Sequence, residues 1–219
     1  MEALARIIDH TNLKPHQPAS AILRLCEEAI KYGFIGVCVN PYWVRLCKER
    51  LRGSGVKVVT VIGFPLGMVK SEVKAYEASL AVDDGADELD MVMNIGAFKS
   101  GDYGTVLKDI RGVVEAGVPV KVILETCYLT QEEIVKACKI AVEAGASYVK
   151  TSTGFGPEGA KVEHVRLMKE AVGGRAKVKA AGGIRTLKQA MEMVEAGADR
   201  IGTSSGVKIM EEYLALNKK

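Results

Sequence analysis

The sequence predicts an α/β fold, a single (β/α)8 TIM barrel with a short N-terminal helix. An amphipathic segment, a glycine and a short apolar run recur at intervals of 22 to 32 residues, as in KIAVEAGASYVKTS and EMVEAGADRIGTS. Such a near-regular period indicates repeated helix–strand units. Most of the apolar runs are short and rich in Val, Ile, Leu or Met, which is typical of strands buried on both faces. No change in composition marks a linker, so residues 1–219 are expected to form one domain.

Each unit is expected to end its helix at a glycine, because glycine adopts the left-handed conformation at little cost. The next strand then begins two or three residues later. The glycines concerned are Gly33, Gly55, Gly85, Gly117, Gly145, Gly174 and Gly197. The expected strands are Ile7–Thr11, Gly36–Asn40, Val56–Ile62, Glu88–Met93, Val118–Glu125, Tyr148–Thr151, Ala176–Ala181 and Arg200–Gly202.

The segments between these strands carry helical periodicity. Ser71–Asp83 is an example, in which one side of a helix is expected to hold Val73, Tyr76, Ala78, Leu80 and Ala81. Strands alternating with helices predict a parallel sheet. A count of eight favours a closed barrel. The alternative is an open doubly wound sheet, which is less favoured because no G-x-G-x-x-G motif follows the first strand.

Composition excludes several classes of function. Lys and Arg (30) nearly balance Asp and Glu (27), which argues against a nucleic-acid binder. No stretch approaches the roughly 20 apolar residues of a membrane span, and the first residues lack the apolar core of a secretory signal. The five cysteines form no C-x-x-C pair and the three histidines lack metal-ligand spacing. We therefore expect a cytoplasmic protein with no metal site.

Two lysines near strand ends are the strongest chemical signal. Lys150 in SYVKTSTG and Lys179 in AKVKAAGG stand 29 residues apart, about one repeat, so they are expected at the same height on adjacent strands. Neighbouring ammonium groups in a partly desolvated barrel mouth disfavour double protonation, so the pKa of one lysine is expected to fall. A neutral amine is the nucleophile that carbonyl chemistry requires. Asp90, at the end of DELD, would complete an acid–base set.

A purely structural role is the alternative explanation for these residues. The two lysines are equally compatible with a structural role, and acidic residues near strands such as Asp90 often cap or pair. Lys57, Lys121 and Lys177 begin their strands and are expected to face solvent at the opposite rim.

Three glycine-rich loops give a second signal. They are STGFG after Lys150, AAGGIRT after Lys179, and GTSSG after the last strand. Backbone N–H groups in such loops bind anions, and barrels of this kind often hold phosphate after strands seven and eight. Ordinary turn and N-cap chemistry is the alternative.

The motifs YVKTSTGF, VKAAGGIRT, GADELDMVMNIG, IDHTNLKP, VCVNPYWV, VKVILETCYL and RIGTSSG together resemble the deoxyribose-phosphate aldolases. The resemblance runs from Ile8 to Gly206. It implies a class I lyase without a metal or other cofactor. Such an enzyme cleaves 2-deoxy-D-ribose 5-phosphate reversibly to D-glyceraldehyde 3-phosphate and acetaldehyde. Its partners would be these small molecules, and a barrel of this size is expected to form a homo-dimer or homo-tetramer.

The resemblance also implies roles for single residues. Lys150 matches the Schiff-base lysine, Lys179 the second lysine that lowers the pKa of the first, and Asp90 the proton-relay carboxylate. Asp9 matches an acidic residue near the substrate hydroxyls, and Cys38 a cysteine near the active site of some members. The loops that hold phosphate are matched by Gly154, Gly182, Gly183, Gly202, Ser204 and Ser205.

One position departs from the pattern. Some members carry a lysine after STG, where this chain has Phe155, so phosphate is expected to rest on backbone amides and helix dipoles. Two other functions stay open. One is a sugar-phosphate isomerase or synthase barrel without covalent chemistry, and the other is a non-catalytic binder of phosphate ligands.

Overall fold

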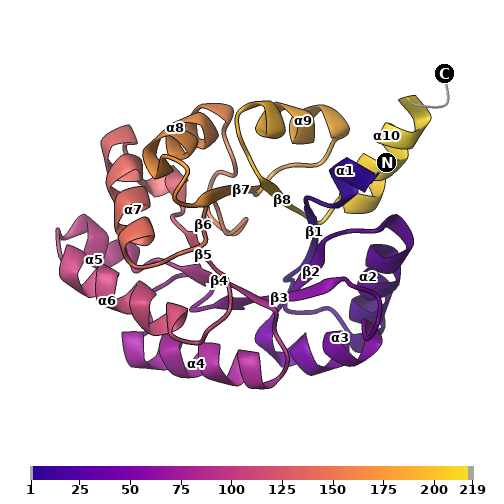
Figure 1. Ribbon diagram of the computed structural model, residues 1–219, viewed down its shortest axis with the longest axis horizontal. Coiled ribbons are helices and arrows are strands. Elements are labelled where there is room, and N and C mark those ends of the chain that lie inside the picture. The colour runs from indigo at the N-terminus through magenta and orange to yellow at the C-terminus, as the bar shows by residue number, and fades with distance from the viewer. Residues whose placement is uncertain (1, 217–219) are drawn as a thin grey trace.

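A computed structural model describes residues 2–216 of the chain. Eight parallel strands close into a barrel in chain order, with helices around the outside (Figure 1). The predicted (β/α)8 barrel is confirmed, and the open doubly wound sheet is excluded by the pairing of the first strand with the last. No described helix has the length and apolar composition needed to cross a bilayer.

All eight predicted strands are present. They are β1 Ile8–Asn12, β2 Gly36–Val39, β3 Lys57–Ile62, β4 Glu88–Val92, β5 Val120–Ile123, β6 Tyr148–Lys150, β7 Lys177–Ala181 and β8 Arg200–Thr203. Strand β5 is four residues shorter than the expected Val118–Glu125. Its end has a local cause, because Glu125 takes a left-handed φ of 53° that no strand can continue through.

The helices form the outer ring. They are α1 Glu2–Ala5, α2 Ala19–Tyr32, α3 Val44–Arg50, α4 Ser71–Asp83, α5 Ile95–Lys99, α6 Tyr103–Val114, α7 Gln131–Glu143, α8 Val162–Val172, α9 Leu187–Glu195 and α10 Gly206–Leu216, with 3-10 turns η1 Pro41–Trp43 and η2 Thr126–Tyr128. The main apolar core lies between these helices and the outer face of the sheet.

The interior of the barrel is different. A small apolar cluster of Leu13, Cys38, Val59 and Val61 occupies one part. Much of the rest is polar, because several strands turn a charged side chain inward. Strand register brings the two predicted lysines level, since Lys150 pairs directly with Lys179. Alternate residues of a strand face opposite sides of the sheet, so both lysines enter the interior together.

The five apolar residues predicted to share one side of α4 do not share one environment. Val73, Tyr76 and Leu80 are 52%, 67% and 46% exposed, whereas Ala78 and Ala81 are buried. The helix is rotated because Lys74 turns inward, where its ammonium donates to Val92 O at 2.8 Å and to Asp109 Oδ2 at 2.5 Å. A buried charge needs such partners, and they fix the orientation of the helix.

Candidate active site

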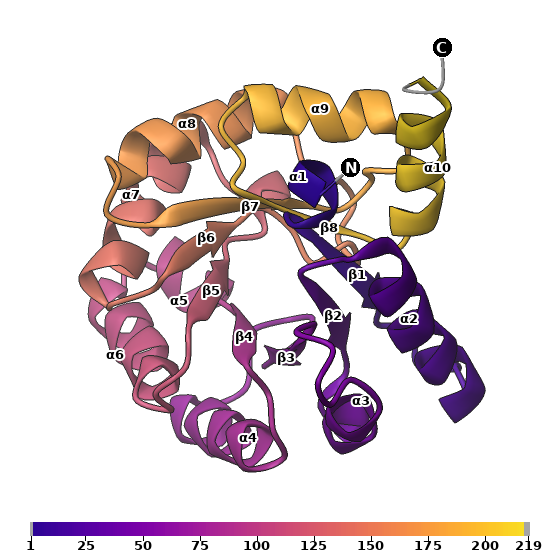
Figure 2. The same ribbon diagram turned by 45° about the vertical axis from the view of Figure 1, so that its right-hand side comes forward.

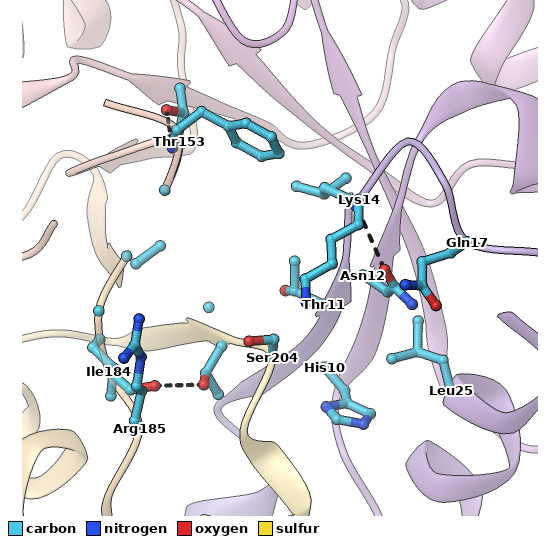
Figure 3. A pocket seen from close by; sticks show the side chains of 18 of the residues that line it. His10, Thr11, Asn12, Lys14, Gln17, Leu25, Thr153, Ile184, Arg185 and Ser204 are labelled. Carbon is cyan, nitrogen blue, oxygen red and sulfur yellow. Dashed lines mark hydrogen bonds between the residues drawn. The ribbon is translucent and has the colours of Figure 1, made fainter. Parts of the chain in front are cut away.

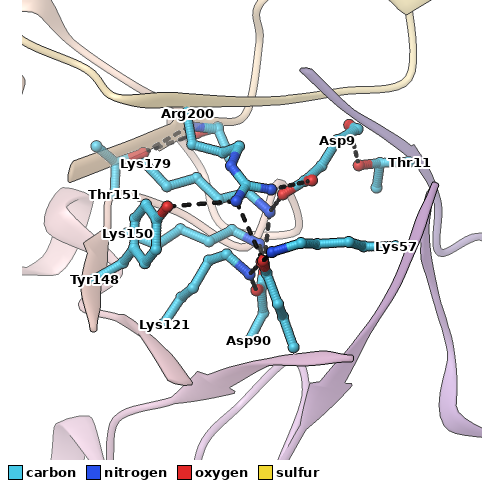
Figure 4. Close-up of polar contacts among 12 residues, drawn as sticks. Asp9, Thr11, Lys57, Asp90, Lys121, Tyr148, Lys150, Thr151, Lys179 and Arg200 are labelled. Carbon is cyan, nitrogen blue, oxygen red and sulfur yellow. Dashed lines mark hydrogen bonds and ion pairs between the residues drawn. The ribbon is translucent and has the colours of Figure 1, made fainter. Parts of the chain in front are cut away.

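Lys150 and Lys179 converge on one carboxylate oxygen inside the barrel (Figure 4). The Lys150 ammonium donates to Asp90 Oδ2 at 2.7 Å, and the Lys179 ammonium donates to the same oxygen at 2.8 Å. Asp90 is fully buried. The structure therefore brings together the three residues that the sequence singled out as a catalytic set.

Two aspartates lie deeper than expected. Asp90 was placed at a strand end but sits in the middle of β4, and Asp9 is the second residue of β1. The carboxylate of Asp9 accepts from Lys179 Nζ at 2.5 Å and from an Arg200 nitrogen at 2.8 Å. Its side chain is completely buried beneath the barrel mouth. Both aspartates thus form the floor of the site.

The sequence interpretation missed three members of this floor, Glu88, Lys121 and Arg200. Lys121 was expected at the solvent rim but is fully buried, because its ammonium pairs with Glu88 Oε2 at 2.5 Å and Asp90 Oδ1 at 3.0 Å. Arg200 also donates to Glu88 Oε1 at 3.3 Å. Lys57 and Lys177 do reach solvent. The sequence did contain a signal for this floor, because charged residues two positions apart, such as Glu88 and Asp90, face the same side of a strand.

The buried ion-pair network determines the protonation states of Asp9 and Asp90. Burial opposes ionisation of Asp9, but the cations Lys179, Lys121 and Arg200 outweigh it and lower its pKa to about 2. Burial likewise opposes ionisation of Asp90, and Lys121, Lys150 and Lys179 hold its pKa well below the usual range. Both carboxylates are therefore ionised at neutral pH.

Lys179 does not have the lowered pKa that was expected for one of the lysine pair. Burial favours its neutral form, but Asp9 and Asp90 outweigh burial and raise its pKa. Lys179 is therefore held as an ammonium at neutral pH.

A pocket of about 720 Å³ opens at the C-terminal ends of the strands (Figure 3). Loops after β6, β7 and β8 form one side of it, and the segment after β1 forms the other. Lys150 lines the pocket. So do the predicted phosphate residues Gly154, Gly182, Gly183, Gly202 and Ser204. This volume suits a small-molecule ligand.

Asp9, Asp90 and Lys179 belong to the floor and do not line this pocket, and two further predicted residues, Ser205 and Cys38, do not line it either. Ser205 instead directs its backbone N–H to Thr203 Oγ1 at 2.9 Å. Cys38 is fully buried against Leu13 and Val59, and burial raises the pKa of its thiol to about 11.

Three cationic side chains that the sequence interpretation overlooked also line the pocket: Lys14, Arg24 and Arg185. Among the described residues, none of them forms an ion pair. Positive charge is therefore available for an anion, although Phe155 carries none. The ring of Phe155 instead meets Phe64 edge-on, with centroids 5.3 Å apart.

The loop beside Lys150 is held by Glu125. One carboxylate oxygen of Glu125 accepts the Thr153 N–H at 3.1 Å, and the other accepts the Thr153 hydroxyl. Thr153 Oγ1 in turn accepts the Phe155 N–H at 3.0 Å. Glu125 is 2% exposed, and it is the one non-glycine residue with positive φ in the described chain. Strained backbone of this kind concentrates at functional sites.

Comparisons with known proteins agree with this geometry. The sequence model of a family described as DeoC/LacD family aldolase matches residues 4–212. The deoxyribose-phosphate aldolase of Thermococcus gammatolerans is 62% identical over 95% of both chains. That of Carboxydothermus hydrogenoformans is 58% identical over 95% of this chain and 94% of its own. A deoxyribose phosphate aldolase from Aeropyrum pernix, described as having a unique tetrameric structure, superposes with a TM-score of 0.91 at 36% identity, covering 98% of this chain and 92% of that one.

Proposed function

The chain belongs to the DeoC/LacD family of aldolases, and from this premise we propose that it cleaves 2-deoxy-D-ribose 5-phosphate through a Schiff base on Lys150. The products are D-glyceraldehyde 3-phosphate and acetaldehyde, and the reaction is reversible. The chain is thus a carbon–carbon lyase of deoxyribose phosphate catabolism. A sugar-phosphate isomerase or synthase is disfavoured, because the relatives at 52–63% identity carry the aldolase name.

One observation carries the assignment of the nucleophile. Of the four cations buried in the described barrel interior, Lys150 is the one that lines the pocket. The other three, Lys121, Lys179 and Arg200, balance the three buried carboxylates Asp9, Glu88 and Asp90. Lys150 can therefore lose its proton without leaving a buried carboxylate unpaired.

The neutral amine of Lys150 attacks the C1 aldehyde, and loss of water gives an iminium ion. The iminium accepts the electron pair of the C2–C3 bond as that bond breaks, because a protonated nitrogen accepts charge that a carbonyl cannot. The C3 hydroxyl loses its proton and becomes the aldehyde of glyceraldehyde 3-phosphate. The remaining enamine takes a proton at C2, and hydrolysis then frees acetaldehyde and Lys150.

Lys179 and Asp90 manage the protons in this proposal. Lys179 is held as an ammonium and can donate a proton, and Asp90 is held as a carboxylate and can accept a hydrogen bond. The Lys179 ammonium donates directly to Asp90 Oδ2. A proton that leaves Lys179 can therefore be replaced through this hydrogen-bond network or from water. Asp9 acts from below by holding Lys179 in position.

Phosphate is proposed to bind where the glycine loops meet the pocket cations. Gly182 and Gly183 have φ values of 91° and 78°, which turn their backbone as few other residues could. Lys14 and Arg185 supply side-chain charge to the same pocket. Gly202 instead leaves room for the Lys179 side chain, since a Cβ at this position would lie 3.0 Å from Lys179 Cε.

We further propose a cytoplasmic homo-oligomer, a dimer or a tetramer, built from single-domain chains. Five free cysteines fit a reducing compartment. The tetrameric relative supports assembly.

A borohydride trap tests the covalent mechanism. Acetaldehyde and borohydride should leave a stable ethyl adduct that peptide mapping places on Lys150, and Lys150→Leu should abolish both adduct and cleavage. Lys177→Leu, at an exposed lysine two residues before Lys179, is the control and should behave like the wild type. Turnover that persists in Lys150→Leu would contradict the mechanism and favour non-covalent chemistry.

A further inference from the structure

The outer surface of α4 and of the loop before it is unusually apolar. Six of the thirteen exposed large apolar side chains among the described residues fall within residues 66–80. They form what we call the α4 patch: Leu66, Met68, Val69, Val73, Tyr76 and Leu80. Figures 1 and 2 both place α4 in the outer ring, with its outward side uncovered by the described chain. An apolar patch of this extent is often functional.

A groove lies beside the patch, between α4 and α6. Its volume is about 330 Å³, and small or apolar residues in it include Ala75, Gly104, Leu107 and Gly112. The small residues Ala75, Gly104 and Gly112 leave room in the groove for a side chain from outside. Tyr76, the residue after Ala75 in α4, is 67% exposed.

The charges of this groove are mixed in sign. Glu72 and Glu115 are acidic, and Lys108 and Arg111 are basic. A surface that pairs with a copy of itself must not carry charge of one sign, because like charges would then face each other. Two acids and two bases allow each acid to meet a base across a two-fold axis.

We propose that the α4 patch and the α4–α6 groove form a two-fold interface between two copies of this chain. Tyr76 of each copy enters the groove of the other. The proposal rests on the homo-oligomer proposed above and locates its interface. The size of the α4 patch agrees with a dimer interface. Its six residues present roughly 600 Å² of exposed surface, and a stable dimer buries about 800 Å² per partner. The flanking charged residues supply the remainder.

Sedimentation velocity of the full chain tests this assignment. Wild-type protein should sediment as an oligomer, and Tyr76→Glu should shift it to half that mass, because the ring that fills the groove is lost and a carboxylate would be buried in its place. Leu80→Arg, on the same face of α4, should do the same. Both side chains are largely exposed in the single chain, so circular dichroism of the variants should match the wild type.

Met191→Glu is the matched control. It replaces an exposed apolar residue on α9, across the barrel from α4, and should leave the wild-type mass unchanged (Figure 2). An oligomer that persists in both α4 variants overturns this interface while leaving the homo-oligomer intact. A wild-type chain that is monomeric overturns the homo-oligomer and the interface together, and catalysis by that monomer would leave the aldolase function standing.

Discussion

The ammonium of Lys121 lies 3.0 Å from Asp90 Oδ1, the oxygen that the two active-site lysines leave free. Asp90 is thereby surrounded by cations, and Lys121 is the one that lowers its pKa most. A residue outside the pocket thus keeps the central carboxylate ionised. Lys121 acts through Asp90 and is a positioning residue in the proposed mechanism.

Replacing Lys121 by Met should destabilise the protein by about 3–5 kcal/mol, because it leaves Glu88 and Asp90 buried with one partner fewer. Urea unfolding followed by circular dichroism measures this. Lys177→Met, at an exposed lysine, should stay within about 0.5 kcal/mol of the wild type. Equal stability of the two variants would contradict the buried network.

The pH dependence of stability should report Asp9. Its pKa is lowered from 3.8 to about 2, so the folded state binds this proton less readily than the unfolded chain does. The resulting stabilisation is complete above the unfolded value and is lost as pH falls towards 2. Its size is on the order of 2 kcal/mol from this shift.

Unfolding free energies measured between neutral pH and pH 2 should therefore fall more steeply for the wild type than for Asp9→Asn. The difference between the two proteins should shrink at the acid end. Parallel curves would show that Asp9 is not held ionised by its cations.

The strands and the lysine pair could be predicted from the sequence for one physical reason. Strands buried on both faces appear as continuous apolar runs, and a regular repeat puts equivalent residues at equal heights. Lys150 and Lys179 follow from this spacing alone. The phosphate loops also lie at the pocket, apart from Ser205.

Other features depended on contacts that a linear pattern does not contain. Lys121 looked like a rim residue because it comes early in its strand, yet inward alternation and two carboxylates bury it. In α4, apolar residues occur on both faces, and the inward turn of Lys74 towards Asp109 decided which face was exposed. Nothing in the sequence marks Glu125 as a non-glycine residue with positive φ.

Lys14 should contribute to phosphate recognition, because it lines the pocket from the segment after β1 and forms no ion pair with the other described residues. Lys14→Met should raise KM for 2-deoxy-D-ribose 5-phosphate about tenfold, as expected for loss of a charge-assisted contact of about 1.5 kcal/mol. KM for unphosphorylated 2-deoxy-D-ribose should not change. Lys188→Met, at an exposed lysine on α9, is the control. An equal effect of Lys14→Met on both sugars would argue against a phosphate contact.

Glu125 should control the loop that carries Thr153 beside Lys150. Glu125→Gln keeps one acceptor oxygen but cannot accept both the Thr153 N–H and its hydroxyl. Loss of a buried hydrogen bond to a charged group costs about 1.5–3 kcal/mol, so kcat/KM should fall at least tenfold.

Two further variants separate the carboxylate of Glu125 from its backbone strain. Glu125→Gly relieves the positive φ of 53° but removes both hydrogen bonds, so it should lose at least as much activity as Glu125→Gln. Wild-type kinetics in Glu125→Gly would instead mean that only the backbone conformation matters. In a double-mutant cycle with Thr153→Val, the losses in kcat/KM should be less than additive, because both changes break the same contact. Full additivity would show that Glu125 acts on the site by some other route than Thr153.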